Sequence, residues 1–148
     1  MRTRAPTSGL AIREAEDGDA GAVIALWHAA GVSRPWNDPV RDFAFARRDG
    51  HACVLVGGIE GRPVATAMVG EDGHRGWVYY VAVEPALQGH GHGAAIMAAA
   101  EAWLAARGVW KVQLLVREDN APVVAFYETL GYRDTRTVCL QKIIEALD

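Results

Sequence analysis

The spacing of apolar residues changes character near the middle of the chain. In the first half, short runs rich in β-branched and aromatic residues, of which 77–83 is the clearest, are separated by turn sequences, which predicts strands joined largely by hairpins. In the second half, Ile96, Ala100, Trp103 and Leu104 recur at helical spacing before Gly108, which predicts a helix with a glycine stop. The strands that we expect are 10–13, 52–59, 64–69, 77–83, 111–116 and 137–144, and the expected helices are 22–30, 39–48, 93–107 and 121–130.

The order of these elements predicts the fold class. A strand, a helix and a strand that follow one another within about 40 residues imply a right-handed parallel crossover. Added to an antiparallel first half, this crossover gives an α/β protein (α+β in its segregation) with a mixed sheet, mostly antiparallel and flanked by about four helices. Asp17 or Asp19 can cap the first helix, and Gly31 ends it.

Composition narrows the class of protein. The 148 residues, 51% apolar and 22% charged, fit one globular domain over 1–148 whose first nine residues are frayed. A charge of 15 − 18 = −3 argues against nucleic acid as a partner, and the lack of an 18-residue apolar run argues against the membrane. Cys53 and Cys139 are expected to be small buried residues of a protein in the reducing cytoplasm. The sequence also allows a single disulfide between them. A homodimer is compatible with the sequence.

The segment that carries the most chemistry is V-A-V-E-P-A-L-Q-G-H-G-H-G-A, residues 81–94. Its glycines, Gly89, Gly91 and Gly93, bare the backbone N–H groups where a loop enters a helix, and such a cradle binds phosphate. A tight packing turn explains the same glycines equally well. A P-loop is excluded because no Gly-Lys-Ser/Thr follows, and a dinucleotide fingerprint should follow its strand at once, whereas Glu84 to Gln88 intervene here.

The spacing Gln88-x-x-Gly91-x-Gly93 resembles the pyrophosphate loop of GCN5-related N-acetyltransferases, which binds acetyl-CoA. The stretch N-A-P-V-V-A-F-Y-E-T-L-G-Y, residues 120–132, resembles the second signature of that family. The resemblance covers residues 10–144. Within the family, the strings R-P-W-N-D-P and D-G-H-R-G look like those of an uncharacterised bacterial member.

This resemblance implies a twisted sheet with a parallel pair that splays, and direct transfer of an acetyl group from acetyl-CoA to a primary amine of a small molecule or peptide. Pantetheine would pair with the backbone of Val81 and Val83, and Asn120 would lie near it, although we interpret Asn120 first as a helix cap. Tyr127 would protonate the CoA thiolate; by sequence alone it is a core residue. The residues that would wrap the pyrophosphate are Gln88, Gly89, His90, Gly91, His92 and Gly93.

The acceptor side is less defined. Some family members place a general-base Glu where this chain has Leu115; Glu71, His74 or Glu84 could replace it through a water, yet each is more typical of a surface residue. We predict no metal, because His90 and His92 lack a third ligand. Trp36, in the turn 34–39, either forms a substrate wall or belongs to a rigid turn, and the other tryptophans, Trp27, Trp77, Trp103 and Trp110, are expected in the core.

Two rival functions share the same loop. A non-catalytic acyl-CoA sensor is favoured by Leu115, which stands in the position of the missing Glu. A nucleotide-binding oxidoreductase is the weaker alternative.

Overall fold

The computed structural model of the chain describes residues 9–145, so the expectation of a frayed end at 1–9 lies almost entirely outside the described residues. They form two compact units, 9–115 and 116–145, which we describe separately. The first unit contains β1 (Ala11–Glu14), a 3-10 turn (Asp17–Asp19), α1 (Ala20–Ala29), α2 (Pro39–Ala46), β2 (Ala52–Ile59), β3 (Arg62–Glu71), β4 (Gly76–Val83), a second 3-10 turn (Pro85–Leu87), α3 (His92–Ala105) and β5 (Val112–Leu114). The second unit contains α4 (Ala121–Thr129).

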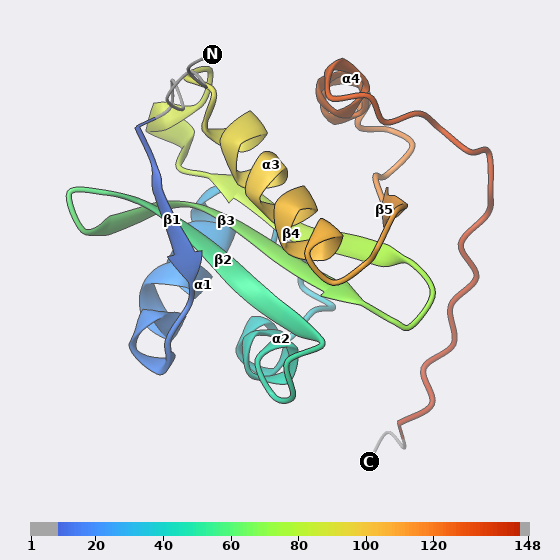
Figure 1. Cartoon of the computed structure of the whole chain (residues 1–148), viewed down its shortest axis with the longest axis horizontal. Helices are drawn as coiled ribbons and strands as arrows, with labels where there is room; N and C mark the ends of the chain where they lie inside the picture. Colours follow the sequence, from blue (N-terminus) through green and yellow to red (C-terminus); the bar gives the residue numbers. More distant parts are fainter. Residues whose placement is uncertain (1–8, 146–148) are drawn as a thin grey trace. The chain divides into compact units, whose positions relative to one another are not determined.

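The five strands form one mixed sheet in the order β1-β2-β3-β4-β5. The pairs β1-β2, β2-β3 and β3-β4 are antiparallel, and the pair β4-β5 is parallel. Helix α3 connects β4 to β5 and crosses one face of the sheet (Figure 1). This topology confirms the predicted mixed sheet with a parallel crossover.

Helices cover the sheet on both faces. Alternate residues of a strand point to opposite sides, so apolar side chains of the strands pack against helices on each side. Trp27 of α1 and Phe43 of α2 belong to one buried cluster with Val54 and Val56 of β2. On the other face, Leu104 of α3 packs so closely that a Cβ added to Gly76 would lie 2.6 Å from its Cδ1. Glycine at the start of β4 therefore lets helix and strand approach.

Element boundaries follow the sequence predictions with small shifts. Strand β2 covers the predicted residues. Strand β3 extends beyond the predicted 64–69 at both ends, and at its start Pro63 pairs with Gly58 next to a register shift. Asp19 occupies the N-cap position of α1 but makes no side-chain bond there. Its carboxylate accepts instead from the Glu16 amide and the Arg13 guanidinium, at 2.7 Å each, and these bonds lower its pKa to about 2.

Three expectations are wrong. Residues 137–144 form no strand, because they pair with no other backbone among the described residues, and an unpaired segment gains none of the hydrogen bonds of a sheet. Cys139 in this segment is exposed, whereas Cys53 is buried as expected, and both are free thiols. Trp110 is 78% exposed, with the Arg75 guanidinium and Lys111 ammonium over its ring. Trp27 is fully buried, and Trp77 and Trp103 are half-buried.

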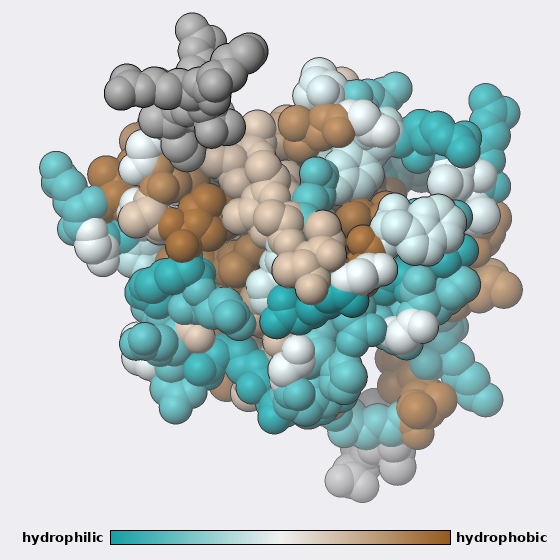
Figure 2. Space-filling model, viewed as in Figure 1, coloured by the Kyte–Doolittle hydropathy of each residue, from teal (hydrophilic) through white to brown (hydrophobic). Residues whose placement is uncertain are grey.

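The surface is mixed in polarity. Figure 2 shows apolar side chains over the outer side of α3, bordered by hydrophilic ones. Within the part of the chain that the structure describes, no helix combines the length and apolar character that a bilayer span requires.

Candidate active site

The centre of the candidate site is a bulge in β4. Thr66 of β3 pairs with Ala82, but Met68 pairs with Tyr79, so Tyr80 and Val81 together face one residue of β3. The bulge places Tyr80 at φ 51°, a left-handed conformation that bulky residues rarely adopt. Such strain persists only where the surroundings hold it in place.

The surroundings of Tyr80 do hold it. The Thr66 hydroxyl, fully buried, donates to the Tyr80 carbonyl oxygen at 3.1 Å and accepts from the Trp27 indole N–H at 2.9 Å. The Tyr80 ring stacks on Trp27 with centroids 3.9 Å apart. Its hydroxyl donates to Asp42 of α2 at 2.7 Å, and desolvation together with this carboxylate raises the pKa of the phenol. Helices α1 and α2 thus fix the bulge from one side.

Beyond the bulge, one edge of β4 is open. The parallel ladder with β5 joins only Gly76–Val78 to Val112–Leu114. Within residues 9–115, the residues after Tyr79, up to Val83, have a strand partner only in β3. Val81 and Val83, both half-buried, lie on this stretch. An unpaired strand edge presents a row of backbone donors and acceptors to an extended ligand.

The same strand leads into the glycine loop. Gly89 and Gly91 have φ of 84° and 85°, the left-handed region in which glycine is unstrained. Gly91 is the N-cap of α3 and supplies no side chain to the helix N–H groups. These amides keep their capacity for an anion at the positive end of a 14-residue helix. Gln88 donates through its amide to the Val83 carbonyl at 3.3 Å, which ties the loop to the strand.

The two histidines of the loop have different environments. His90 is exposed, whereas His92 is 5% exposed and its buried Nδ1 has no hydrogen-bond partner. Their ring centroids are 6.2 Å apart. Because the His92 ring is turned into the protein, its backbone N–H is the group available to a ligand. Among the described residues, no cluster of three His, Cys, Asp or Glu side chains is placed to hold a metal.

A pocket of about 710 Å³ adjoins the bulge on the α2 side. Tyr79 and Tyr80 both line it, since the bulge turns two consecutive side chains toward the same region. Asn37 from the turn 34–39 also lines it. Trp36 is 65% exposed, and Asp38 caps α2 by accepting from the Arg41 amide at 3.0 Å. The turn therefore caps a helix and borders the pocket.

The candidate bases are engaged in other contacts. Glu71 accepts from the Gly73 amide at 2.7 Å and lies 2.6 Å from the His51 Nδ1, contacts that lower the pKa of the carboxyl and raise that of His51. Glu84 forms an ion pair with Arg62 at 2.9 Å. His74 lies on the exposed β3–β4 turn, next to Arg75. The lowered pKa of Glu71 makes that carboxylate a weak base, and Glu84 is already engaged by Arg62.

Asn120 and Tyr127 belong to the second unit. Asn120 occupies the N-cap position of α4, as predicted, but its side chain makes no capping bond. The Tyr127 ring contacts Phe126 and Tyr132 edge-on, at centroid distances of 5.0 and 5.8 Å. Burial raises the pKa of the Tyr127 phenol to about 12, so its proton is retained at neutral pH.

The structure brings the loop residues Gln88–Gly93 together with Val81 and Val83 in the first unit. Thr66, Tyr80 and Asp42 were not among the predicted site residues. The residue types in 77–83 do not predict a bulge, because the conformation of Tyr80 depends on Thr66 and Asp42, which are 14 and 38 positions away.

Comparison with known proteins agrees with this geometry. The model of the Acetyltransferase (GNAT) family matches residues 16–132. An acetyltransferase of Pectobacterium atrosepticum is 40% identical over 131 residues, 88% of this chain and 93% of the relative. The chain therefore belongs to the GNAT family of acetyltransferases.

Solved structures share the fold. A putative acetyltransferase from Agrobacterium tumefaciens superimposes with a TM-score of 0.76 at 24% identity, over 90% of this chain and 99% of that one. AAC(6')-Iy, in complex with the bisubstrate analogue CoA-S-monomethyl-acetylneamine, gives a TM-score of 0.78 at 14% identity. The match covers 90% of this chain and 97% of that one.

Proposed function

We propose that the chain is a single N-acetyltransferase domain that moves an acetyl group from acetyl-CoA directly to a primary amine in a ternary complex. The observation that carries the proposal is the continuity of β4. One strand supplies the bulge, the open edge after it and the glycine loop at its end. The bisubstrate analogue bound to the structural neighbour joins CoA to the acceptor, which supports a complex that holds both substrates at once.

In this proposal, each part of acetyl-CoA has a matching part of the first unit. The pyrophosphate binds the amides of Gln88, Gly89, His90, Gly91, His92 and Gly93, because the left-handed glycines and the uncapped helix end present N–H groups. Pantetheine, which is extended and carries amides, pairs with the open edge at Val81 and Val83. The thioester then lies near the bulge, where backbone donors can polarise its carbonyl.

The transfer itself is a displacement at the thioester carbon. The neutral amine forms a C–N bond, the C–S bond breaks, the amine loses a proton, and the CoA thiolate gains one. Tyr127, which is protonated at neutral pH, donates that last proton as the C–S bond breaks, and the resulting phenolate takes a proton back from solvent. Asn120, whose side chain makes no capping bond, is in this proposal a further contact for pantetheine.

No side chain is assigned as the base. Glu71 is engaged by His51 and Glu84 by Arg62. The position at which some family members have a general-base Glu is occupied here by Leu115, which is 57% exposed. Water therefore accepts the proton, and the fraction of neutral amine limits the rate.

Release of free thiol from acetyl-CoA, measured with a panel of amines and basic peptides, tests this function. We expect amine-dependent release together with binding of CoA and no binding of NAD. If CoA binds but every amine leaves the thioester intact, the sensor function replaces the enzyme. If NAD binds and CoA does not, the oxidoreductase function replaces both.

A further inference from the structure

The lining of the pocket beside α2 follows β3 from Met68 to Glu71 and continues into Asp72. At one end, Tyr79 pairs with Met68 next to the bulge; at the other, Glu71 pairs with Gly76. The three steps along β3 from Met68 to Glu71 correspond to about 10 Å. If acetyl transfer occurs at the bulge, the far end of the pocket lies about 10 Å from the reacting nitrogen.

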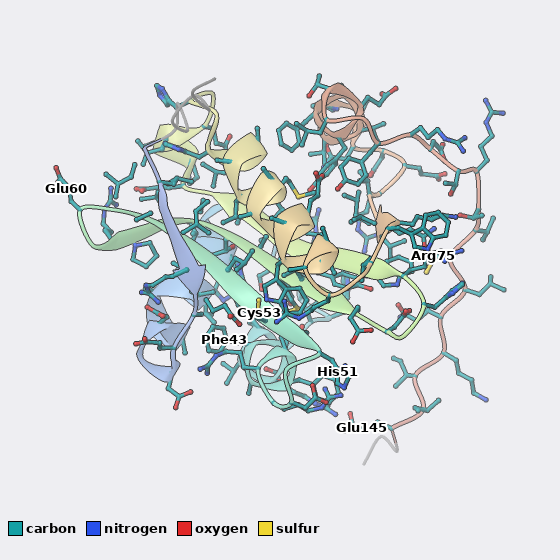
Figure 3. The ribbon with its side chains drawn as sticks, viewed as in Figure 1. Phe43, His51, Cys53, Glu60, Arg75 and Glu145 are labelled. Carbon is teal, nitrogen blue, oxygen red and sulfur yellow. The ribbon has the colours of Figure 1, made fainter. Side chains whose placement is uncertain are left out.

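Carboxylates dominate the charge of this pocket. The lining includes four of them, Asp42, Asp49, Glu71 and Asp72, against Arg48 and the imidazole of His51. Figure 3 shows His51 beside α2, with Arg75 at the turn that joins β3 to β4. The whole chain has a formal charge of only −3. A large part of its excess of negative charge therefore lies around this one pocket.

Backbone amides hold the two carboxylates at the far end. Asp72 accepts from the amides of His74 and Arg75 at 2.9 and 2.8 Å, and Glu71 accepts from Gly73. The His51 imidazole, whose Nδ1 lies 2.6 Å from Glu71, is the main cause of the lowered pKa of the Glu71 carboxyl, and the Gly73 amide adds to it. For Asp72 the backbone amides are the main cause of the lowered pKa. Both carboxylates are therefore fixed in orientation, Asp72 by backbone amides and Glu71 by an amide and by His51, with which Glu71 shares its charge.

Aromatic side chains form the wall between the two ends. The rings of Trp77 and Tyr79 are stacked at 6.3 Å, and Tyr79 is 44% exposed. The Trp77 indole N–H donates to Asp72 at 3.1 Å, which fixes the ring next to the carboxylate. Aromatic faces attract ammonium and guanidinium groups. Phe45, also in the lining, already has the Arg48 guanidinium 3.5 Å from its ring.

We propose that this pocket selects acceptors with a second positive charge about 10 Å from the nitrogen that is acetylated. The second cation lies between Glu71 and Asp72, and the chain that joins the two nitrogens lies along Trp77 and Tyr79. A long diamine or a basic peptide has this form. The inference rests on the proposed acetyl transfer and adds the charge and length of the acceptor.

Two matched pairs of amines test it. Diaminooctane, whose extended chain spans the pocket, is compared with octylamine, and diaminobutane, which is too short, with butylamine. After correction for two equivalent nitrogens, we expect kcat/KM for diaminooctane to exceed that for octylamine about tenfold, from two exposed charge contacts and a cation–π contact. The short pair should differ much less. Equal ratios for the two pairs overturn the proposal.

Charge-removing variants locate the effect. Glu71→Gln and Asp72→Asn keep oxygen acceptors for the backbone amides, and each should lower the long-pair ratio by up to about fivefold. Glu60→Gln is the matched control: it removes the same charge at the tip of the β2–β3 hairpin, away from the pocket (Figure 3), and should leave the ratio unchanged. An equal loss of ratio in the control overturns the assignment.

Salt and direct binding separate this inference from the proposed function. At about 1 M ionic strength, where charges are screened within roughly 3 Å, the advantage of diaminooctane should largely disappear. If no amine is acetylated, calorimetric titration of the CoA-bound chain still decides: diaminooctane should bind more tightly than octylamine. Equal binding overturns the pocket assignment, whereas absent turnover with unequal binding refutes only the acetyl transfer.

Discussion

Thr66 connects three elements through one hydroxyl. It accepts from Trp27 of α1 and donates to the carbonyl of Tyr80 in β4, within a fully buried part of β3. In the sequence it is one polar residue inside an apolar strand, and nothing near it reveals either partner. Its role depends on Trp27 and Tyr80, 39 and 14 positions away. The contacts of single residues in the site were therefore the hardest feature to predict from the sequence.

Replacing Thr66 with Val keeps the side-chain shape and removes the hydroxyl. A buried N–H and a buried carbonyl then lose a partner, so we expect the free energy of unfolding in urea to fall by about 3 kcal/mol. Thr66→Ser retains the hydroxyl and should lose much less. Equal stabilities for the Val and Ser variants would show that the hydroxyl does not support the bulge.

Tyr127→Phe tests the proposed proton donor. Removal of the hydroxyl should lower kcat by about 10²-fold, at the lower end for general acids because a thiolate is a fair leaving group. The Kd of acetyl-CoA should barely change, since the hydroxyl acts on charge that develops later. Stopped assays of thiol release, with calorimetry on the same folded variant, measure both constants. Wild-type turnover would make Tyr127 a packing residue.

At the scale of elements, the strands and helices with strong internal patterns were predictable. The apolar run 52–59 became β2, where β1 and β3 supply its partners. Gly89 and Gly91 became left-handed in the loop that leads into α3, a conformation that glycine adopts without help from distant residues. Residues 137–144 have the same β-forming composition but lack a partner strand among the described residues. Composition supplies the propensity of a strand, and pairing requires a second backbone.

The two thiols report on these elements. Burial raises the pKa of Cys53 in β2 to about 12, so at pH 8 roughly 10⁻⁴ of it is thiolate. Cys139 is exposed. We expect a thiol-specific reagent to modify one thiol rapidly in the native chain and the second only after unfolding, with no rapid reaction in Cys139→Ser. Protection of Cys139 would show that residues 137–144 are covered.

At the scale of the whole molecule, the mixed sheet and the family followed from the order of elements and from two short signatures. The pocket beside α2 could not be predicted, because its carboxylates and aromatic rings come from α2, β3 and β4 and from the turns next to them. Only the folded sheet brings them together.

The absence of an assigned base predicts the pH dependence of the whole reaction. An alkyl ammonium with a pKa near 10.4 releases its proton as the pH rises, so kcat/KM should increase about tenfold per pH unit between roughly pH 6 and 9. The sign is fixed by the neutral amine, which is the reactive form. A flat profile over this range, at constant stability, would require a tuned base among the side chains of the pocket.

The central claim is that the glycine loop and the open edge of β4 bind acetyl-CoA. Calorimetric titration of CoA into Gly93→Glu tests it most directly. Gly93 is the second residue of α3, where a carboxylate favours the helix, so the variant should fold at least as well as the wild type. Its side chain would fill the anion site and repel the pyrophosphate. We predict that Kd rises at least about 100-fold, whereas Ala98→Glu, the same charge added at an exposed position of α3, leaves Kd unchanged. An unchanged Kd in the folded Gly93→Glu variant would contradict the claim.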